Sequence, residues 1–211
     1  MATRRVGEKA GLTRERVLDA ALDYVDRHGL PALSMRRLGA ELGVEAMSLY
    51  NHVPHKEALF DALVDRVLET AMAAVDAPDA WLPWMRGYAH ALRAAFLAHP
   101  GVLPLAATRP VGSAASMRRS ERWLGAMRAA GLPLDRAMDV ITVLTTFTIG
   151  HTLAEAGRTP GHEEAATPAV MPDPAEFPLL AEVIETGAGA DAAARFTVAV
   201  DLLLAGYAGS G

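Results

Sequence analysis

The sequence predicts an all-α protein, with a small N-terminal domain of three helices followed by a larger helical domain. Apolar residues recur at three- and four-residue spacing in one stretch after another, which is the period of a helix that packs one face against a core. Glycine and proline separate these stretches, as at Gly29, Pro31 and Pro100. The chain has 211 residues and is 51% hydrophobic, so it is long enough for one or two domains with a buried core.

The first helix is expected to run from Thr13, a favourable capping residue, to about His28. Gly29 is a natural stop for this helix, and Pro31 prevents its continuation. Its apolar stripe consists of Val17, Ala20, Ala21, Tyr24 and Val25.

Two short helices joined by a tight turn are expected in the stretch SMRRLGAELGVEAMSLYNHVPHK, residues 34–56. Ser34 can cap the first of them, and Gly43 can adopt the left-handed backbone conformation of a sharp turn. The second helix covers about Glu45–His52 and ends before Pro54. The inner face is formed at helical spacing by Leu38, Leu42, Leu49 and Val53. This pattern predicts a helix-turn-helix, and a plain structural corner is the alternative.

The outer face of the second helix lacks the lysine and glutamate of an ordinary surface helix. Small, amide and aromatic groups suit base edges and phosphates in the major groove, so this face predicts a DNA-reading surface. Its members are Ala46, Met47, Ser48, Tyr50, Asn51 and His52. Lys56 follows at the start of the next helix, where its charge and the free backbone amides are suited to a phosphate.

The charge distribution supports this prediction, although the net charge of −5 alone argues against nucleic-acid binding. Residues 1–56 hold nine Lys or Arg against seven Asp or Glu, and residues 57–211 hold eleven against eighteen. A basic head on an acidic body suits a protein that places one end on phosphate. Arg4, Arg5 and Lys9 lie in a tail that is either solvated or a DNA-binding arm.

Other classes of protein find little support in the sequence. There is no cysteine, which excludes disulfides, thiolate metal sites and cysteine nucleophiles. No secretory signal and no run long enough to span a bilayer are recognised, so a cytoplasmic protein without a membrane partner is expected. No nucleophile motif or phosphate-binding loop is present, and we expect no enzyme and no cofactor. His151 and Glu155 have the spacing of two ligands on one helix, but no third ligand accompanies them, so no metal site is predicted.

The domains are expected at 1–56 and 57–211, with a helix over residues 56–75 that links them. Further helices are expected over residues 81–98, 113–130, 134–156, 176–186 and 191–207, with an irregular turn at 103–110 and a mobile loop at 158–174. Segment 134–156 is apolar and rich in β-branched residues, so a buried strand is the alternative to a helix. The last helix carries a second apolar stripe of Phe196, Val200, Leu203, Leu204 and Tyr207. Two such helices indicate a homodimer interface built as a four-helix bundle.

The segments LSMRRLGAELGV and SLYNHVPHKEALFDAL resemble, in this order and spacing, the TetR family of transcriptional regulators. FLAHP, ATRP and PLLAEVIETG further along the chain resemble the tetracycline-repressor branch. The resemblance implies a homodimer that binds a palindromic operator in double-stranded DNA. It also implies that Arg36, Tyr50, His52 and Lys56 occupy DNA-contacting positions.

The resemblance further implies an effector pocket in the C-terminal domain. Large or amphipathic side chains expected there are Met72, Tyr88, Leu92, Trp123, Met127, Thr145, Phe147 and His151, together with Leu105, Thr108 and Arg109 around the ThrArgPro turn. In the tetracycline branch, a magnesium-ligating histidine stands where this chain has Leu105, a drug-contacting asparagine stands at Tyr88, and a contacting histidine stands at Met72. A larger, apolar or aromatic effector is therefore expected in place of a magnesium chelate.

Three functions follow as hypotheses. The first is a repressor released from its operator by a hydrophobic small molecule. The second is a constitutive or activating DNA-binding dimer without an effector, and the third is a ligand-binding protein or enzyme that keeps only the fold. Loss of operator binding on adding an effector separates the first from the second, and salt-dependent operator binding separates both from the third.

Overall fold

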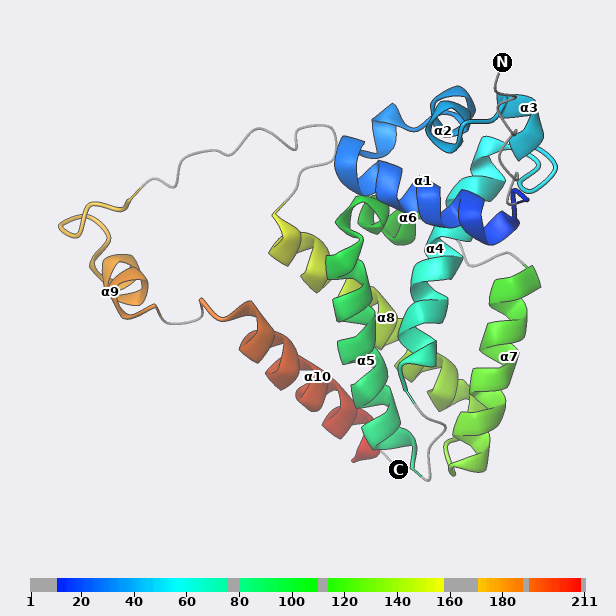
Figure 1. The fold of residues 1–211 in the computed structure, drawn as a ribbon. Coiled ribbons are helices and arrows are strands. Elements are labelled where there is room, and N and C mark those ends of the chain that lie inside the picture. Colours follow the sequence, from blue (N-terminus) through cyan, green and yellow to red (C-terminus); the bar gives the residue numbers. More distant parts are fainter. Residues whose placement is uncertain (1–10, 76–79, 110–113, 158–170, 188–189, 210–211) are drawn as a thin grey trace, which may run out of the picture.

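The computed structural model describes residues 11–75, 80–109, 114–157, 171–187 and 190–209. These residues form helices and no strands, as the sequence predicts (Figure 1). The α-helices are α1 (Arg14–His28), α2 (Met35–Leu42), α3 (Ala46–Leu49), α4 (Lys56–Ala73), α5 (Trp81–Ala98), α6 (Leu103–Thr108), α7 (Ala114–Ala129), α8 (Leu134–Ala156), α9 (Pro178–Thr186) and α10 (Ala192–Ala208). Two 3₁₀ turns, η1 (Leu30–Ala32) and η2 (Pro100–Val102), precede α2 and α6.

The N-terminal helices begin and end where the sequence predicts. Thr13 Oγ1 accepts a hydrogen bond from the Arg16 amide, and Ser34 Oγ accepts one from the Arg37 amide, so both residues cap their helices. Gly29 ends α1 with a positive φ of 75°. The second helix of the motif is shorter than expected: α3 covers only four residues, and residues 50–52 continue as a turn.

The C-terminal helices pack around α5 and α8. α5 lies between α4 and α8, α10 packs across α5 and α8, and α7 flanks α8 on the other side (Figure 1). Segment 134–156 is a helix, which excludes the alternative of a buried strand. The stripe expected to meet a partner subunit faces inward instead: Phe196, Val200 and Leu204 are fully buried in this chain's own core.

The segment expected as an irregular turn is helical and forms α6. Pro104 stands in its first turn, where a missing amide costs nothing and a fixed φ favours the helix. Thr108 Oγ1 closes the far end by donating to the Pro104 carbonyl at 2.7 Å. The expectation of an irregular turn over residues 103–110 was therefore wrong for Leu103–Thr108.

α8 also corrects the expectation that no segment is long enough to span a bilayer. Within the described residues it is the one helix whose length of 23 residues and mean hydropathy of 1.3 would suit a membrane span. Its buried residues, including Val140, Leu144 and Thr148, pack in the core with α5, α6, α7 and α10. About 28% of this apolar stretch is buried inside the chain, so core packing accounts for only part of the apolar character of α8.

α9 stands away from the other helices and has no buried residue (Figure 1). Four of its apolar side chains are exposed: Leu179, Leu180, Val183 and Ile184. The expected cap at Ser113 and most of the expected loop at 158–174 lie outside the described residues.

The first helix rests on the segment between α5 and α6. His99 Nδ1 lies 2.7 Å from Asp26 Oδ2, and an added Cβ at Gly101 would lie 2.5 Å from Val25 Cγ1. Because a side chain at position 101 would clash with Val25, the close packing of α1 on this segment depends on Gly101.

Candidate nucleic-acid interface and ligand cleft

Two glycines shape the turn between α2 and α3. Gly43 has φ 67°, and its amide bonds back to the carbonyls of Ala40 and Gly39. Gly39 itself is buried beneath the next helix: an added Cβ would lie 2.9 Å from the Val44 carbonyl oxygen and 3.1 Å from the Ala46 amide. The close approach of the two helices therefore depends on Gly39, while the reversal of direction depends on Gly43.

The inner and outer faces of this unit agree with the sequence prediction. Leu38, Leu49 and Val53 are buried at 0–1% exposure and hold α2 and α3 against α1 and α4. On the outer face Met47 is 71% exposed and Tyr50 is 40% exposed. Asn51 is exposed, and Ala46, Ser48 and His52 are half-buried. Met47, Tyr50 and Asn51 are thus left on a surface that the motif's own packing does not use, whereas Ala46 also packs against the core.

Basic side chains flank this surface. Arg36 is exposed and makes no hydrogen bond or ion pair with the described residues, whereas its neighbour Arg37 donates to the Ala32 carbonyl at 2.9 Å. Lys56 Nζ lies 5.1 Å from the centre of the Phe60 ring. His55 caps α4, because its Nδ1 accepts the Ala58 amide at 3.0 Å. One amide expected to be free for phosphate is therefore already paired.

A cleft of about 380 Å³ opens between α4, α5 and α7. One wall is apolar and aromatic, with Met72 from the end of α4, Val75 just after that helix, Trp84 from α5, and Trp123 and Ala126 from α7. Charged side chains add polar atoms: Glu69, Arg119 and Arg122. The cleft has the composition of a small-molecule site, mostly apolar with a few polar groups.

An aromatic cluster backs this cleft. The Trp123 ring lies 4.6 Å from Trp84 and 4.3 Å, edge-on, from Tyr88, which follows Trp84 by one turn of α5. The Tyr88 hydroxyl is 3.1 Å from Thr145 Oγ1 on α8. Burial raises the pKa of Tyr88 above its usual value, so the hydroxyl stays neutral.

The residues predicted to bind a ligand do not all meet at this cleft. Met72 and Trp123 line it, and Tyr88 and Thr145 lie directly behind Trp123. Leu92 and Met127 are fully buried in the hydrophobic core. Leu105, Thr108 and Arg109 belong to α6 and its end, and do not line the cleft. The prediction did not include Trp84, Arg119 or Arg122. Trp84 precedes Tyr88 by four residues and Arg119 precedes Trp123 by four, and this helical spacing is the signal that identifies them.

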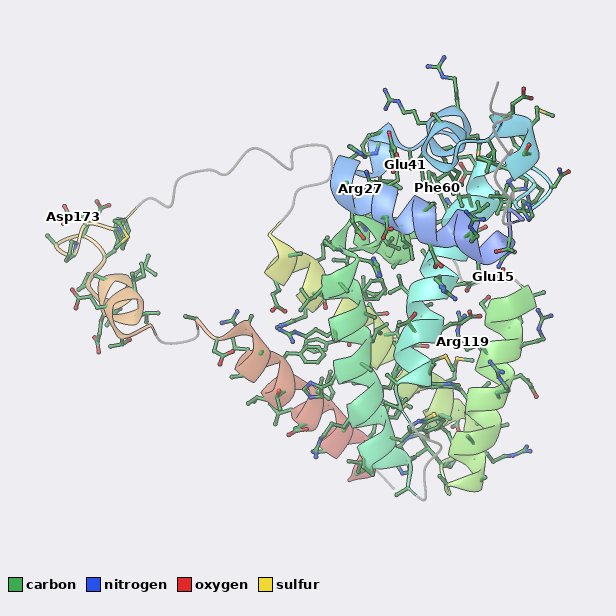
Figure 2. All side chains as sticks on the ribbon, viewed as in Figure 1. Glu15, Arg27, Glu41, Phe60, Arg119 and Asp173 are labelled. Atoms are coloured by element: carbon green, nitrogen blue, oxygen red, sulfur yellow. The ribbon has the colours of Figure 1, made fainter. Side chains whose placement is uncertain are left out.

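Arg109 joins α6 to α4 near the reading surface. Its Nε donates to Asp61 Oδ1 at 2.6 Å, and its Nη1 donates to Glu57 Oε2 at 2.8 Å. The hydrogen bonds to Asp61 and Glu57 raise the pKa of Arg109 above its already high value. Its guanidinium also lies 5.6 Å from the Phe60 ring, the ring that Lys56 contacts, and Figure 2 shows Phe60 on the upper part of α4.

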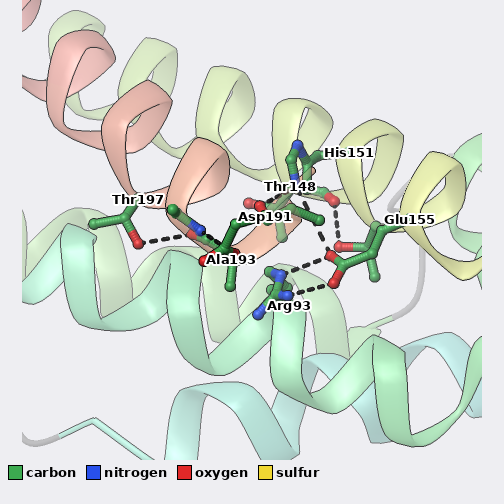
Figure 3. A network of polar contacts seen from close by, with 10 residues as sticks. Arg93, Thr148, His151, Glu155, Asp191, Ala193 and Thr197 are labelled. Atoms are coloured by element: carbon green, nitrogen blue, oxygen red, sulfur yellow. Dashed lines mark hydrogen bonds and ion pairs between the residues drawn. The ribbon is translucent and has the colours of Figure 1, made fainter. Parts of the chain in front are cut away.

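His151 belongs to a polar network between α5, α8 and the start of α10 (Figure 3). Its Nε2 lies 3.1 Å from the Ala192 carbonyl oxygen and 3.8 Å from Glu155 Oε2. Arg93 donates to both oxygens of Glu155, which lowers the pKa of that carboxyl. Within the described residues no three His, Asp or Glu side chains gather to hold a metal ion. His151 and Glu155 thus join helices, and the buried alkyl side chain of Leu105 offers no ligand to magnesium.

Comparison with known proteins gives matches over both parts of the chain. Residues 17–63 match the family described as "Bacterial regulatory proteins, tetR family", and residues 76–209 match "Tetracyclin repressor-like, C-terminal domain". The chain is 32% identical over 187 residues to the HTH-type transcriptional repressor DrrR1 of Streptomyces coeruleorubidus, covering 86% of this chain and 67% of that protein.

Two further relatives cover nearly all of both chains. Identity to the class A tetracycline repressor protein from Escherichia coli is 34%, over 87% of this chain and 86% of that one. The fold matches the Streptomyces coelicolor protein ActR, solved in complex with actinorhodin, with a TM-score of 0.71 and 30% identity over 96% of this chain and 100% of the other.

Proposed function

The chain belongs to the TetR family of bacterial regulatory proteins, and we propose that it is a homodimeric repressor released from its operator by an aromatic, largely apolar compound. It is a DNA-binding transcriptional regulator. One observation carries the proposal about release: α4 begins beside the reading surface at Lys56 and ends at the cleft with Met72. As a regulator that must meet chromosomal DNA, it is expected to act in the cytoplasm.

The proposed DNA contacts follow from exposure and chemistry. The free guanidinium of Arg36 suits the acceptor edge of a guanine, and the hydroxyl of Tyr50 suits a phosphate. Met47, exposed by 71%, offers an apolar surface for a thymine methyl group, with Ala46 beside it. Ser48, Asn51, His52 and Lys56 add polar or charged contacts to the backbone. Two copies related by a two-fold axis would read a palindrome, with half-sites spaced by whole helical turns.

The proposed dimer uses the outward faces of α8 and α10. On α10, Val198 is 59% exposed and Leu202 is 69% exposed, and small residues (Ala194, Ala205 and Gly206) share their face. On α8, Met138 and the small residue Gly150 are exposed. Small side chains allow helices to approach closely, so two copies of this face can form a four-helix bundle. A second copy would also offer apolar surface for the exposed leucines of α9.

The proposed effector is defined by the cleft. Its tryptophans favour flat aromatic rings, and the known relative ActR is described in complex with actinorhodin. Neither the alkyl side chain of Leu105 nor the thioether of Met72 is a ligand for magnesium, so binding should not require the ion. We therefore propose that a ligand releases this protein from its operator, as in the tetracycline repressors, but that the ligand is not a magnesium chelate.

The coupling follows from the length of α4. Lys56 and Met72 are sixteen residues apart, or roughly 24 Å along a helix. A compound that widens the cleft displaces Met72. The stiff helix α4 then tilts and moves the DNA-binding unit formed by α2 and α3. The two half-sites of an operator match only one distance between the α2–α3 units of the two subunits. A ligand that favours the tilted state by about 1–3 kcal/mol therefore lowers operator affinity about 5–150-fold.

Operator selection from a random DNA pool tests the first part of this proposal. The full-length protein should enrich a palindrome, and binding should weaken steeply with salt because phosphate contacts release counterions. Enrichment of no common sequence, or binding unaffected by salt, would contradict the assignment of α2 and α3 as the reading unit.

A further inference from the structure

Two residues that line the cleft between α4, α5 and α7 each carry a buried hydrogen-bond donor that has no acceptor in the described part of the chain. Trp84 Nε1 and Arg119 Nη1 are both buried, and no acceptor lies within hydrogen-bond distance of either atom in the described part of the chain. The two residues are 8% and 6% exposed, and both side chains line the cleft. Buried donors are nearly always paired in folded proteins, so two in one cleft require an explanation.

One nitrogen of the buried Arg119 guanidinium has no hydrogen-bond acceptor. Nη2 donates to Asp65 Oδ1 on α4 at 3.1 Å, which holds the side chain between α7 and α4 (Figure 2). Nη1 is left over from this pair. A guanidinium binds carboxylate or carbonyl oxygen through its remaining N–H groups without giving up its first partner, since it has five donors.

The rest of the lining selects the body of the ligand. Trp84 and Trp123, 4.6 Å apart, present aromatic surface, while Met72, Val75 and Ala126 add apolar contacts. Glu69 and Arg122 also line the cleft, with opposite charges, and Asp65 balances the charge of Arg119. These charges cancel, so the cleft attracts neither anions nor cations strongly through its net charge. The orientation of a bound ligand therefore depends on the unpaired donors.

We propose that the effector is a flat aromatic compound that carries an acceptor oxygen, best a carboxylate, which receives hydrogen bonds from Trp84 and Arg119. This inference rests on the proposed function, because it specifies the ligand of the same cleft. Trp84 and Arg119 then act as the residues that select and orient the ligand. The aromatic rings of the ligand lie against the tryptophans and Met72 at the end of α4.

Two anthracene derivatives of similar shape test this assignment on the full-length protein. 9-Anthracenecarboxylate carries acceptors, and 9-anthracenemethylammonium carries only donors. Binding is followed by energy transfer from tryptophan to anthracene and confirmed by calorimetry. The carboxylate should bind at least about tenfold more tightly, since charge-assisted hydrogen bonds are among the stronger ones. Equal affinities, the reverse order, or no binding of either probe would overturn the proposal.

A conservative variant separates hydrogen bonding from packing. Trp84→Phe keeps an aromatic ring but removes the N–H, so it should weaken carboxylate binding about three- to tenfold and leave the methylammonium compound unaffected. Arg119→Lys keeps the charge opposite Asp65 but loses the forked geometry, and should also weaken the carboxylate selectively. Trp81→Phe is the matched control, because Trp81 starts α5 but does not line the cleft.

Variants that weaken both probes alike, or neither, would remove Trp84 and Arg119 from the ligand contacts. No DNA is present in this assay, so its outcome is independent of operator release. If the protein releases its operator with apolar compounds yet shows no preference for the carboxylate, the proposed function stands and this inference fails.

Discussion

Arg109, at the end of α6, donates a hydrogen bond of 2.6 Å from its Nε to Asp61 on α4. The same guanidinium pairs with Glu57, one residue after Lys56 at the N-terminal end of α4. α6 in turn packs on α8 in the C-terminal domain. Arg109 therefore links the domain that contains the cleft to the N-terminal part of α4, which follows the helix-turn-helix of α2 and α3.

Replacing Arg109 with methionine should weaken the communication between ligand and DNA. The carboxylates of Glu57 and Asp61 are 63% and 44% exposed, so the loss of folding stability should be small, about 0.5–1 kcal/mol. A coupling reduced by about 1 kcal/mol lowers the ratio of operator affinities without and with ligand about fivefold. Operator titrations with and without a releasing compound measure this ratio.

Arg86→Met serves as the control for Arg109→Met. Arg86 makes a similar exposed ion pair with Asp201, which joins α5 to α10 and does not involve α4. An unchanged affinity ratio in Arg109→Met, or an equal loss in Arg86→Met, would show that Arg109 has no special part in coupling.

Arg36→Ala should lower operator affinity by about 1–3 kcal/mol and relax sequence preference at one position of each half-site. The reason is that Arg36 is exposed without a partner in the described structure and is expected at a base edge. Tyr50→Phe should instead weaken binding to all sequences about equally, as expected of a phosphate contact. Titrations with the selected palindrome and its single-base variants distinguish the two patterns. Wild-type binding by both mutants would refute the assigned contacts.

Leu202→Glu should convert the dimer into a monomer. Leu202 is 69% exposed in the single chain, so the charge is tolerated there, but in a helical interface it would be buried without a partner at a cost of about several kcal/mol. Light scattering coupled to size exclusion reports the mass. Met117→Glu on α7 changes an exposed methionine outside the proposed interface and should remain dimeric. A monomeric wild-type protein, or a dimeric Leu202→Glu variant, would exclude this interface.

Glu155→Gln should remove a pH-dependent part of the folding stability. Hydrogen bonds from Arg93 lower the pKa of Glu155 below its ordinary value of 4.5, so the folded state favours the ionised carboxylate. The stabilisation is present above that value and is lost as pH falls through the lower pKa of the folded state. Urea unfolding should therefore show a deficit of about 1 kcal/mol at neutral pH that shrinks in buffers below pH 4.5. A deficit independent of pH would mean that Arg93 does not favour the charged form.

The sequence predicted the helix-turn-helix well because its determinants are local. Ser34 and Gly43 act within a few residues of their position, and the burial of Leu49 and Val53 follows from helical spacing. Segment 103–110 was predicted as an irregular turn, because a proline can either end a helix or start one, and the packing of α6 against α8 is not visible in the local sequence.

The ligand site was only partly predictable because it depends on which helices meet. Met72 and Trp123 were expected and do line the cleft, but Arg109 and His151 pair with groups from distant segments. For the last helix, spacing identified an apolar stripe without revealing whether it faced the chain's own core or a second subunit. Phe196 and Leu204 proved to be core residues, and Leu202 next to them is the exposed one.

Release from operator DNA tests the central claim most directly. The selected operator is titrated with the protein in the presence of a panel of hydrophobic aromatic compounds, and separately with tetracycline, each with and without magnesium. At least one aromatic compound should lower operator affinity about 5–150-fold, and magnesium should not change this effect. Magnesium-dependent release by tetracycline would contradict the conclusions drawn from Leu105, Tyr88 and Met72 together.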